Sequence, residues 1–462
     1  MQIKKATKLC KKYLERLRKF QKIISFSNST TCSSNQNRNS EESILSLINK
    51  RKPNQALSRN FYIDNEIFNK EMEYLFSNCW IFAGHDCEIL NPGQWMTLQV
   101  GNNPIVIIRN NDNSLKAFYN ICRHRGHLIC QEDYGCSKKL VCKYHRWTYN
   151  LDGSLFNAPD MNKVKCEEDD PNFFDPERLS LKQVQVKSID GYIFISLAND
   201  DDVPPFLTIQ NVLGPFVKPY NLQNAKVAFE SRIVEKGNWK IVWENNRECY
   251  HCKVHHPELS LTFPNWSTVA YNIEKKDNDE FIRDNELVEK CEGMGLASLK
   301  KIDDNKQNRS VRIALKRGAI SMTLSGQPAI RNKTLGNFSM KEDTGDVCYY
   351  NYPNTWNHFQ ADHCISFRML PISPTETELV TKWIVPKDAV EGVDYDLKTL
   401  TEVWLATNDQ DRKLVESVQK GIASKVFEPG PYSIYHESPV ISFVEWYCKT
   451  FKSGLERKLS KL

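Results

Sequence analysis

Two pairs of metal-ligating side chains constrain this chain more than any other feature. Cys122 and His124 form the first pair, and Cys142 and His145 form the second, in the pattern C-x-H-x17-C-x2-H. Two thiolates and two imidazoles are the ligands of a [2Fe-2S] cluster in which the cysteines bind one iron and the histidines bind the other. Because imidazole is neutral and thiolate is anionic, this set raises the reduction potential above that of an all-cysteine cluster. The four residues therefore predict a domain that passes single electrons.

The same four residues could instead hold a structural zinc ion, which also accepts two cysteines and two histidines. Zinc-binding segments usually have the spacings C-x2-C and H-x3-5-H, whereas each half of this pattern mixes the two ligand types. The spacing therefore favours the iron-sulfur cluster. A zinc-binding interaction protein remains the alternative from another functional class.

The charge of the chain is distributed unevenly. The net charge is +5, but residues 1–60 hold 14 basic and 3 acidic residues, which leaves 48 basic and 54 acidic residues in the rest. The body is therefore mildly acidic, and no nucleic-acid-binding surface is predicted. No apolar run approaches the roughly 18 residues of a membrane span, so a soluble protein is expected.

The basic N-terminal segment, residues 1–45, is predicted to be a disordered extension. Its first 40 residues contain a single acid, Glu15, and are rich in Lys, Ser, Thr and Asn. This composition is typical of an organellar transit peptide, but a solvated tail without a targeting role has similar traits. No secretory signal is visible, so the 15 cysteines are expected to be free thiols and metal ligands in a reducing compartment, the cytoplasm or the mitochondrial matrix.

Two folded domains are predicted after an N-terminal helical segment at residues 46–78. Short β runs divided by Gly, Asn and Asp turns fill residues 79–198 and predict an all-β domain that presents the two cluster loops. An Asp run at 200–202 and a Pro pair at 204–205 then mark a boundary. Residues 199–462 contain β-like runs followed by helical patterns, which favours an α+β catalytic domain.

A helical pattern at about residues 239–256 contains a second group of ligand types, namely Glu248, His251, His255 and His256. Two imidazoles and one carboxylate form the facial triad of non-haem Fe(II) oxygenases, in which open positions admit O2 and substrate. On a regular helix His251 and His255 share a face, because they stand at i and i+4. The residues alone therefore leave the second histidine open between His255 and His256.

Cys249 and Cys252 admit other interpretations of the same segment. With a neighbouring histidine they could hold zinc, and the string C-Y-H-C superficially resembles a redox or haem-attachment box. Haem attachment needs a histidine where the chain has Lys253, and no βαβ pattern surrounds the two cysteines. These alternatives are therefore disfavoured.

The two cluster loops resemble those of Rieske oxygenases. His127 and Tyr144 stand where Rieske proteins of respiratory complexes carry two further cysteines, which favours the oxygenase branch. The matching residues around the ligands are Arg125, Gly126, Tyr144, Trp147, Asp152 and Gly153.

Residues 244–259 are similar to the family's E/D-x2-H-x4-H motif. The resemblance implies that His251 and His256 bind the mononuclear iron. It also implies that Glu248 connects the two metal centres between subunits, as the carboxylate that accepts hydrogen bonds from a cluster histidine of one subunit and an iron-ligand histidine of the next.

The family takes its third iron ligand from a late helix, and a helical pattern at about 395–422 supplies one here. Residues 410–421 match the local pattern QD-x2-LVE-x-VQ-x-G, which implies Asp411 as the carboxylate ligand. Asp409 and Asp362 are weaker candidates.

Within the family, the chain is most similar to the oxygenases of quaternary ammonium compounds, the branch of glycine betaine, choline and carnitine monooxygenases and stachydrine demethylase. The stretches ENNRECYHC, MTLSGQPA, YPNTWNHF and TKWIVPKDAVEGVDYDL carry this similarity. It implies an α+β fold whose catalytic domain has an antiparallel sheet flanked by helices (helix-grip, START-like). It also implies one Rieske [2Fe-2S] cluster and one Fe(II) per subunit, a homotrimer, and an NAD(P)H-dependent flavin and ferredoxin-type reductase as the electron donor.

The implied reaction is O2-dependent hydroxylation of an N-methyl group, with glycine betaine giving dimethylglycine and formaldehyde. Choline, carnitine or stachydrine oxidation and ring dihydroxylation are the alternatives on the same scaffold. A trimethylammonium group cannot donate a hydrogen bond, so aromatic faces must recognise it. Tyr350, Tyr352 and Trp356 are the candidates, although such residues more often belong to a core.

Overall fold

The computed structural model describes residues 30–161, 174–264, 279–339 and 342–460. The chain divides into a large unit, residues 51–454, and a small unit formed by residues 1–50 and 455–462. Within the described ranges, no helix combines the length and the apolar character needed to cross a membrane.

The small unit contains helix α2 (Thr30–Asn49). Residues 30–45 of this helix belong to the segment that composition predicts to be a disordered extension. Ile44 and Ile48, one helical turn apart, are both buried and give the helix an apolar side. The predicted transit peptide lies mostly in residues 1–29, outside the described residues.

Short helices follow at the start of the large unit, in the segment predicted to be helical. These are α3 (Asn60–Ile63), α4 (Asn65–Tyr74) and the 3-10 turn η1 (Phe76–Asn78). Asp64 begins α4, because its carboxylate accepts hydrogen bonds from the backbone N–H groups of Glu66 (2.7 Å) and Ile67 (3.2 Å).

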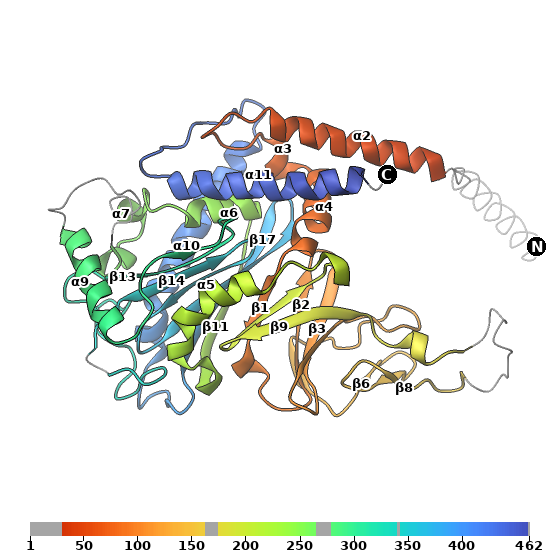
Figure 1. Cartoon of the computed structure of the whole chain (residues 1–462), viewed down its shortest axis with the longest axis horizontal. Coiled ribbons are helices and arrows are strands. Elements are labelled where there is room, and N and C mark those ends of the chain that lie inside the picture. The colour runs from red at the N-terminus through yellow and green to blue at the C-terminus, as the bar shows by residue number, and fades with distance from the viewer. Residues whose placement is uncertain (1–29, 162–173, 265–278, 340–341, 461–462) are drawn as a thin grey trace, which may run out of the picture. The chain divides into compact units, whose positions relative to one another are not determined.

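The all-β domain predicted at 79–198 is built from antiparallel strands (Figure 1). A seven-stranded sheet has the order β1-β10-β9-β4-β3-β2-β5, and a small sheet has the order β6-β7-β8. The strands are β1 (Ile81–His85), β2 (Gln94–Val100), β3 (Asn103–Arg109), β4 (Leu115–Tyr119), β5 (Tyr134–Cys136), β6 (Leu140–Val141), β7 (Thr148–Tyr149), β8 (Leu155–Asn157), β9 (Gln183–Ile189) and β10 (Tyr192–Ser196).

The predicted catalytic domain, residues 199–462, has a second seven-stranded antiparallel sheet with helices packed against it, in agreement with the predicted α+β class. The sheet order is β11-β17-β16-β15-β14-β13-β12, and α10 packs against β11 and α6. The strands are β11 (Ala225–Glu235), β12 (Lys301–Ile302), β13 (Asn308–Ile313), β14 (Asp346–Asn351), β15 (Thr355–Phe359), β16 (Cys364–Ser373) and β17 (Glu376–Pro386). The helices are α5 (Leu207–Val217), α6 (Trp239–Asn246), α7 (Cys252–His255), α9 (Asp279–Gly293), α10 (Leu397–Ile422) and α11 (Ser438–Leu459).

The two predicted domains share one hydrophobic core rather than meeting at a polar boundary. Phe82 of β1 and Tyr192 of β10 are buried together with Tyr349 of β14 and Phe359 of β15. The Tyr192 hydroxyl donates a hydrogen bond to Asn357 (2.8 Å), which ties the two sheets together. This shared core explains why residues 51–454 form a single unit.

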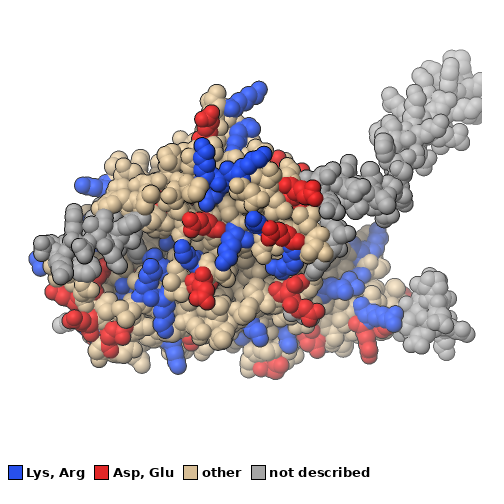
Figure 2. All heavy atoms as spheres, turned by 45° about the horizontal axis from the view of Figure 1, so that its top comes forward, with Lys and Arg blue, Asp and Glu red and all other residues tan. Residues whose placement is uncertain are grey.

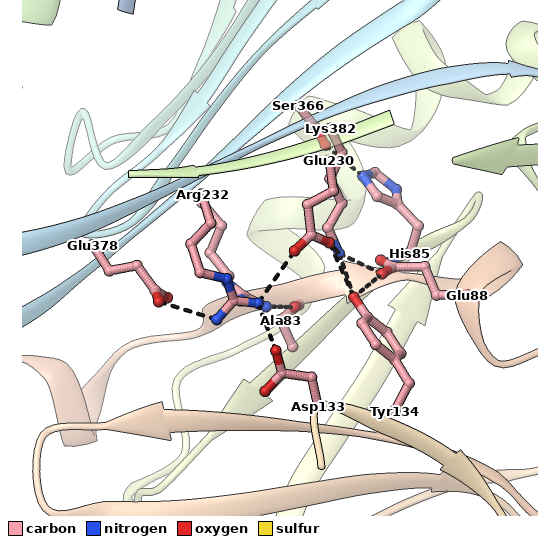
Figure 3. A network of polar contacts seen from close by, with 11 residues as sticks. Ala83, His85, Glu88, Asp133, Tyr134, Glu230, Arg232, Ser366, Glu378 and Lys382 are labelled. Atoms are coloured by element: carbon pink, nitrogen blue, oxygen red, sulfur yellow. Dashed lines mark hydrogen bonds and ion pairs between the residues drawn. The ribbon is translucent and has the colours of Figure 1, made fainter. Parts of the chain in front are cut away.

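A polar network that is buried at Lys382 and Glu88 also connects the two sheets (Figure 3). The ammonium group of Lys382, on β17, forms an ion pair with Glu88 and lies 3.0 Å from the hydroxyl of Tyr134. Tyr134 also donates a hydrogen bond to Glu88 (2.7 Å). Arg232, on β11, extends the network to Asp133 (3.2 Å). The Lys382 charge overcomes the effect of burial and holds the pKa of Glu88 at about 2.

The surface carries charges of both signs. Figure 2 shows Lys and Arg side chains interspersed with Asp and Glu side chains over the face in view.

Candidate cluster and metal centres

The two loops that carry the cluster candidates have the same backbone construction. In the first loop, the Cys122 N–H donates to the His127 carbonyl (2.9 Å), and the Gly126 N–H donates to the Cys122 carbonyl (3.0 Å). In the second, the Cys142 N–H donates to the Trp147 carbonyl (2.8 Å), and the Arg146 N–H donates to the Cys142 carbonyl (3.0 Å). Each loop therefore places its cysteine and histidine on one tight turn.

Each turn needs one residue with left-handed backbone geometry at the equivalent position. Gly126 has φ of 74°, which glycine adopts freely, but Arg146 has φ of 61°, which is costly for a residue with a Cβ atom. Retention of this conformation at Arg146 indicates that the loop must keep its shape around the ligands.

The four predicted ligands fit a [2Fe-2S] cluster by burial and by donor chemistry. Cys122 and Cys142 are buried, and the rings of His124 and His145 lie 4.6 Å apart between centroids. Nδ1 of His124 is buried without a hydrogen-bond partner, as expected for a nitrogen that binds a metal. Burial, and then the neighbouring His145, lower the pKa of His124, which favours the neutral imidazole that a metal requires.

Trp147, noted in the sequence as part of the cluster motif, supports one of these histidines. Its ring is stacked on His124 with 4.8 Å between centroids. The Tyr149 hydroxyl, which sequence reasoning missed, accepts a hydrogen bond from the Arg123 N–H (3.0 Å) and lies 3.4 Å from the Cys122 sulfur. Tyr149 is therefore placed to contact a cluster thiolate.

The second group of ligands forms where α6 and α7 are interrupted. The single helix predicted at about 239–256 is wrong in detail, because α6 ends at Asn246 and α7 begins at Cys252. The intervening turn brings Nε2 of His251 to 3.1 Å from Nε2 of His256, although the two residues stand at i and i+5. Asp411, from α10, completes the group, with Oδ1 at 3.0 Å from Nε2 of His256 and 3.4 Å from Nε2 of His251.

This arrangement fits a mononuclear metal ion. Two ligand atoms at right angles, each about 2.1 Å from a metal, are separated by about 3 Å, which matches the observed distances. Oδ1 of Asp411 is buried and lies beside the Nε2 atoms of the two histidines, so it is placed to serve as a ligand. Burial alone would lower the pKa of His251, but hydrogen bonds with Asp411 and Glu248 raise it to about 9. The site therefore favours a positive charge.

The outer nitrogen of each histidine is held by a neighbouring oxygen, which directs both Nε2 atoms inward. Nδ1 of His251 is hydrogen-bonded to Glu248, and Nδ1 of His256 to the Gln410 amide oxygen (2.7 Å). The Gln410 amide in turn donates to Glu258 (2.8 Å). The sequence pattern included Gln410 but did not reveal this contact.

The alternative ligands lie elsewhere. His255 is exposed and does not line the cavity at the site. Asp409 forms ion pairs with Arg412 and Lys413, and Asp362 pairs with its neighbour His363 (3.0 Å). The structure therefore gathers His251, His256 and Asp411 and leaves His255, Asp409 and Asp362 apart.

Cys249 and Cys252 form a disulfide in the turn that carries His251, with 4.9 Å between their Cα atoms. The expectation that the cysteines are free thiols is therefore wrong for this pair, because the turn brings residues i and i+3 within bonding distance. Ten other cysteines in the described part of the chain are free.

A cavity of about 120 Å³ adjoins the three ligands. Tyr350 and Trp356, two of the predicted cation-binding aromatics, line it, but Tyr352 does not. Tyr352 follows the end of β14 and packs in the core against Trp243, with 4.7 Å between ring centroids. Trp404 lines the cavity instead. The sequence could have predicted that Trp404 lies near Asp411, because the two residues are seven positions apart and share a face of α10.

Comparison with known proteins matches both halves of the chain. Residues 79–168 match the Rieske [2Fe-2S] domain, and residues 222–453 match the ring hydroxylating alpha subunit (catalytic domain). The glycine betaine monooxygenase oxygenase subunit of Pseudomonas aeruginosa (strain UCBPP-PA14) is 41% identical over 414 residues, which cover 88% of this chain and 92% of that protein. The carnitine monooxygenase oxygenase subunit of Escherichia coli (strain K12) is 32% identical over 48% of this chain and 60% of that protein.

Solved structures show the same fold. A quaternary ammonium Rieske monooxygenase in complex with L-carnitine superposes with a TM-score of 0.62 at 21% identity, over 88% of this chain and 98% of that one. Naphthalene 1,2-dioxygenase with bound indole gives a TM-score of 0.64 at 20% identity, over 89% of this chain and 97% of that one.

Proposed function

Because the chain belongs to the Rieske oxygenase family, with a Rieske [2Fe-2S] domain followed by the catalytic domain of a ring hydroxylating alpha subunit, we propose that it removes an N-methyl group from glycine betaine. The observation that carries the substrate is the 41% identity to a glycine betaine monooxygenase oxygenase subunit over 92% of that protein. The cavity beside His251, His256 and Asp411, with aromatic walls, supports it.

When bound, the cluster supplies single electrons and the non-haem iron supplies a site for O2 activation. Cys122, His124, Cys142 and His145 would hold the cluster, and the group at His251 would hold the iron. Glu248 fixes the ring of His251 through Nδ1. Glu248 thereby orients this ligand. We propose that it also contacts a cluster histidine of a neighbouring subunit.

The cavity walls position the substrate. Trp356 and Tyr350 line the cavity, and a trimethylammonium group prefers to lie within about 6 Å of an aromatic centroid. Hydroxylation of one N-methyl carbon gives a hemiaminal, which breaks down to formaldehyde and dimethylglycine. The reaction consumes one O2, two electrons and two protons, and it releases one water.

The arrangement of the two centres supports a homotrimer in which the cluster of one subunit serves the iron of the next. In Figure 1, the small sheet with β6 and β8, which flanks the second cluster loop, lies far from α7 at the iron site. His124 and His145 are only partly buried, which suits electron exchange with a partner. We propose an NAD(P)H-dependent flavin and ferredoxin-type reductase as the donor, because the related protein is an oxygenase subunit.

We place the protein in a reducing compartment, since ten of its described cysteines are free. Because the reported relatives are bacterial proteins, the cytoplasm is preferred to the mitochondrial matrix.

The function is tested with the holoenzyme, a surrogate reductase and NADH. Glycine betaine, choline, L-carnitine and proline betaine are supplied in parallel, and formaldehyde and the demethylated amine are measured. Equimolar formaldehyde and dimethylglycine from glycine betaine are expected. Absence of formaldehyde with every quaternary ammonium compound, from enzyme with both metal centres filled and a cluster that accepts electrons, would refute the proposal.

A further inference from the structure

We propose that Arg247 and Arg309 form a carboxylate-binding site in the cavity and restrict the substrate to zwitterionic betaines. The inference rests on the proposed function, because it names the part of the substrate that the aromatic residues cannot recognise. A trimethylammonium group is common to glycine betaine and choline, whereas a carboxylate is present only in the betaine. The two arginines therefore decide between these substrates.

Arg309 begins a row of side chains that crosses four strands. It is directly opposite Tyr350 on the next strand, Tyr350 is opposite Trp356, and Trp356 is opposite Phe367. Directly opposed residues of antiparallel strands project from the same face of a sheet. The row thus places a cation at one end of the face and aromatic rings beside it. A zwitterionic substrate needs this arrangement, because its carboxylate binds the cation and its trimethylammonium group binds the rings.

Arg247 approaches the same ring from the end of α6. Its guanidinium carbon lies 4.1 Å from the centroid of Tyr350, and that of Arg309 lies 5.7 Å from it. Both arginines line the cavity that adjoins the metal ligands. Two guanidinium groups from distant parts of the chain therefore converge on one aromatic ring at the cavity wall.

No acid in the described part of the chain lies within ion-pair distance of Arg247. Its Nε is buried without a hydrogen-bond partner, and its NH1 group makes one long hydrogen bond of 3.4 Å to the Asn246 amide oxygen. Burial, and the neighbouring charge of Arg247, lower the pKa of Arg309. An anion that binds between two guanidinium groups reduces the repulsion between their like charges.

The carboxylates that line the same cavity are already engaged at the metal site. Glu248 accepts hydrogen bonds from the backbone N–H of Tyr250 and from His251, and Asp411 faces His251 and His256. Neither carboxylate forms an ion pair with Arg247 in the described part of the chain. When the substrate carboxylate binds the guanidinium groups, the trimethylammonium group of the substrate lies against the aromatic walls and towards the metal site.

The test measures binding, so that it does not depend on turnover. Isothermal titration of the oxidised holoenzyme is performed with glycine betaine, choline and tetramethylammonium, for the wild type and for Arg247→Met, Arg309→Met and Arg309→Lys. Arg317→Met is the matched control, because Arg317 is exposed and lies outside the cavity. We expect the wild type to bind glycine betaine at least tenfold more tightly than choline.

Each methionine variant at the site should weaken the binding of glycine betaine about tenfold or more. This is the loss typical of a charge-assisted hydrogen bond. Tetramethylammonium binding should change less than twofold, Arg309→Lys should recover part of the loss, and Arg317→Met should behave as the wild type. Equal binding of choline and betaine by the wild type would overturn the inference. So would a loss that is the same for betaine and for tetramethylammonium.

The two proposals fail differently. If choline binds and is demethylated as well as glycine betaine, the demethylation stands and the carboxylate site is refuted. If no compound yields formaldehyde but betaine binding depends on both arginines, the carboxylate site stands and the reaction is refuted.

Discussion

Replacing Lys382 by methionine should destabilise the protein strongly, because this residue neutralises a buried carboxylate between the two sheets. Lys382 is 3% exposed, and the side chain of Glu88 is 4% exposed. The ammonium group also contacts the Tyr134 hydroxyl at 3.0 Å (Figure 3). Methionine fills similar space but leaves Glu88 buried without its cation, which is the costly way to break an ion pair.

The magnitude follows from the pKa of Glu88. Burial alone would raise this pKa, but the charge of Lys382 holds it at about 2 instead of the ordinary 4.5. At about 1.36 kcal/mol per pKa unit, this difference corresponds to about 3 kcal/mol of stabilisation. Because the pKa is depressed in the folded state, the stabilisation is fully present above pH 4.5 and is lost as the pH falls towards 2.

The assay is denaturation by guanidinium chloride, followed by far-UV circular dichroism and by cluster absorbance. Lys382→Met should lose about 3 kcal/mol at pH 7, and the difference from the wild type should shrink as acid protonates Glu88. The double variant with Glu88→Gln should recover part of the loss, because no charge then remains buried. Lys398→Met, at an exposed position, is the control. A loss below about 1 kcal/mol at pH 7, or no recovery in the double variant, would refute the reasoning.

The remaining predictions concern the two metal centres. Dithionite-reduced protein should give a Rieske EPR signal with two cluster irons per chain, and Cys142→Ala should bleach its visible spectrum; bound zinc without the signal would contradict this assignment. His256→Ala and Asp411→Ala should each remove the mononuclear iron, measured by metal analysis, while the cluster spectrum persists and His255→Ala retains the iron; full iron occupancy in either of the first two would exclude that ligand. Glu248→Gln should keep both metals but slow single-turnover demethylation and stopped-flow reoxidation of the cluster by 10- to 100-fold, roughly the loss seen when a ligand's supporting residue is changed. A wild-type reoxidation rate would leave Glu248 without this role.

The fold class could be predicted from the sequence because alternating β runs and a long amphipathic helix are local patterns. The late helix was expected at about 395–422 and is observed as Leu397–Ile422, where Asp396 caps its start by accepting a hydrogen bond from the Thr399 N–H (2.9 Å). The domain boundary predicted at residue 199 said less about how the two domains pack. The aromatic core that joins Phe82 to Phe359 depends on contacts between distant strands, which no local pattern reveals.

The residues of the cavity wall were still harder to predict from local sequence patterns. Arg247 and Arg309 are separated by a long stretch of chain and meet only because β13 pairs with β14 in one particular register. A shift by one residue would turn Arg309 to the other face of the sheet. Tyr352 was grouped with Tyr350 by proximity in sequence, yet it lies beyond the end of β14 and packs against Trp243, so only Tyr350 lines the cavity. Prediction of a binding wall therefore requires the register, which only the folded structure provides.

The choice between His255 and His256 shows why spacing must be considered together with local backbone. A regular helix from 239 to 256 would put His251 and His255 on one face and rotate His256 away by about 100°. The helix instead stops at Asn246, and the turn that follows carries a disulfide from Cys249 to Cys252. Within that turn the i,i+5 pair converges to 3.1 Å, while His255 points to solvent. The interruption of the helix thus brings the predicted ligand pair together, and a stretch that kept the helix intact would place His255, rather than His256, beside Asp411.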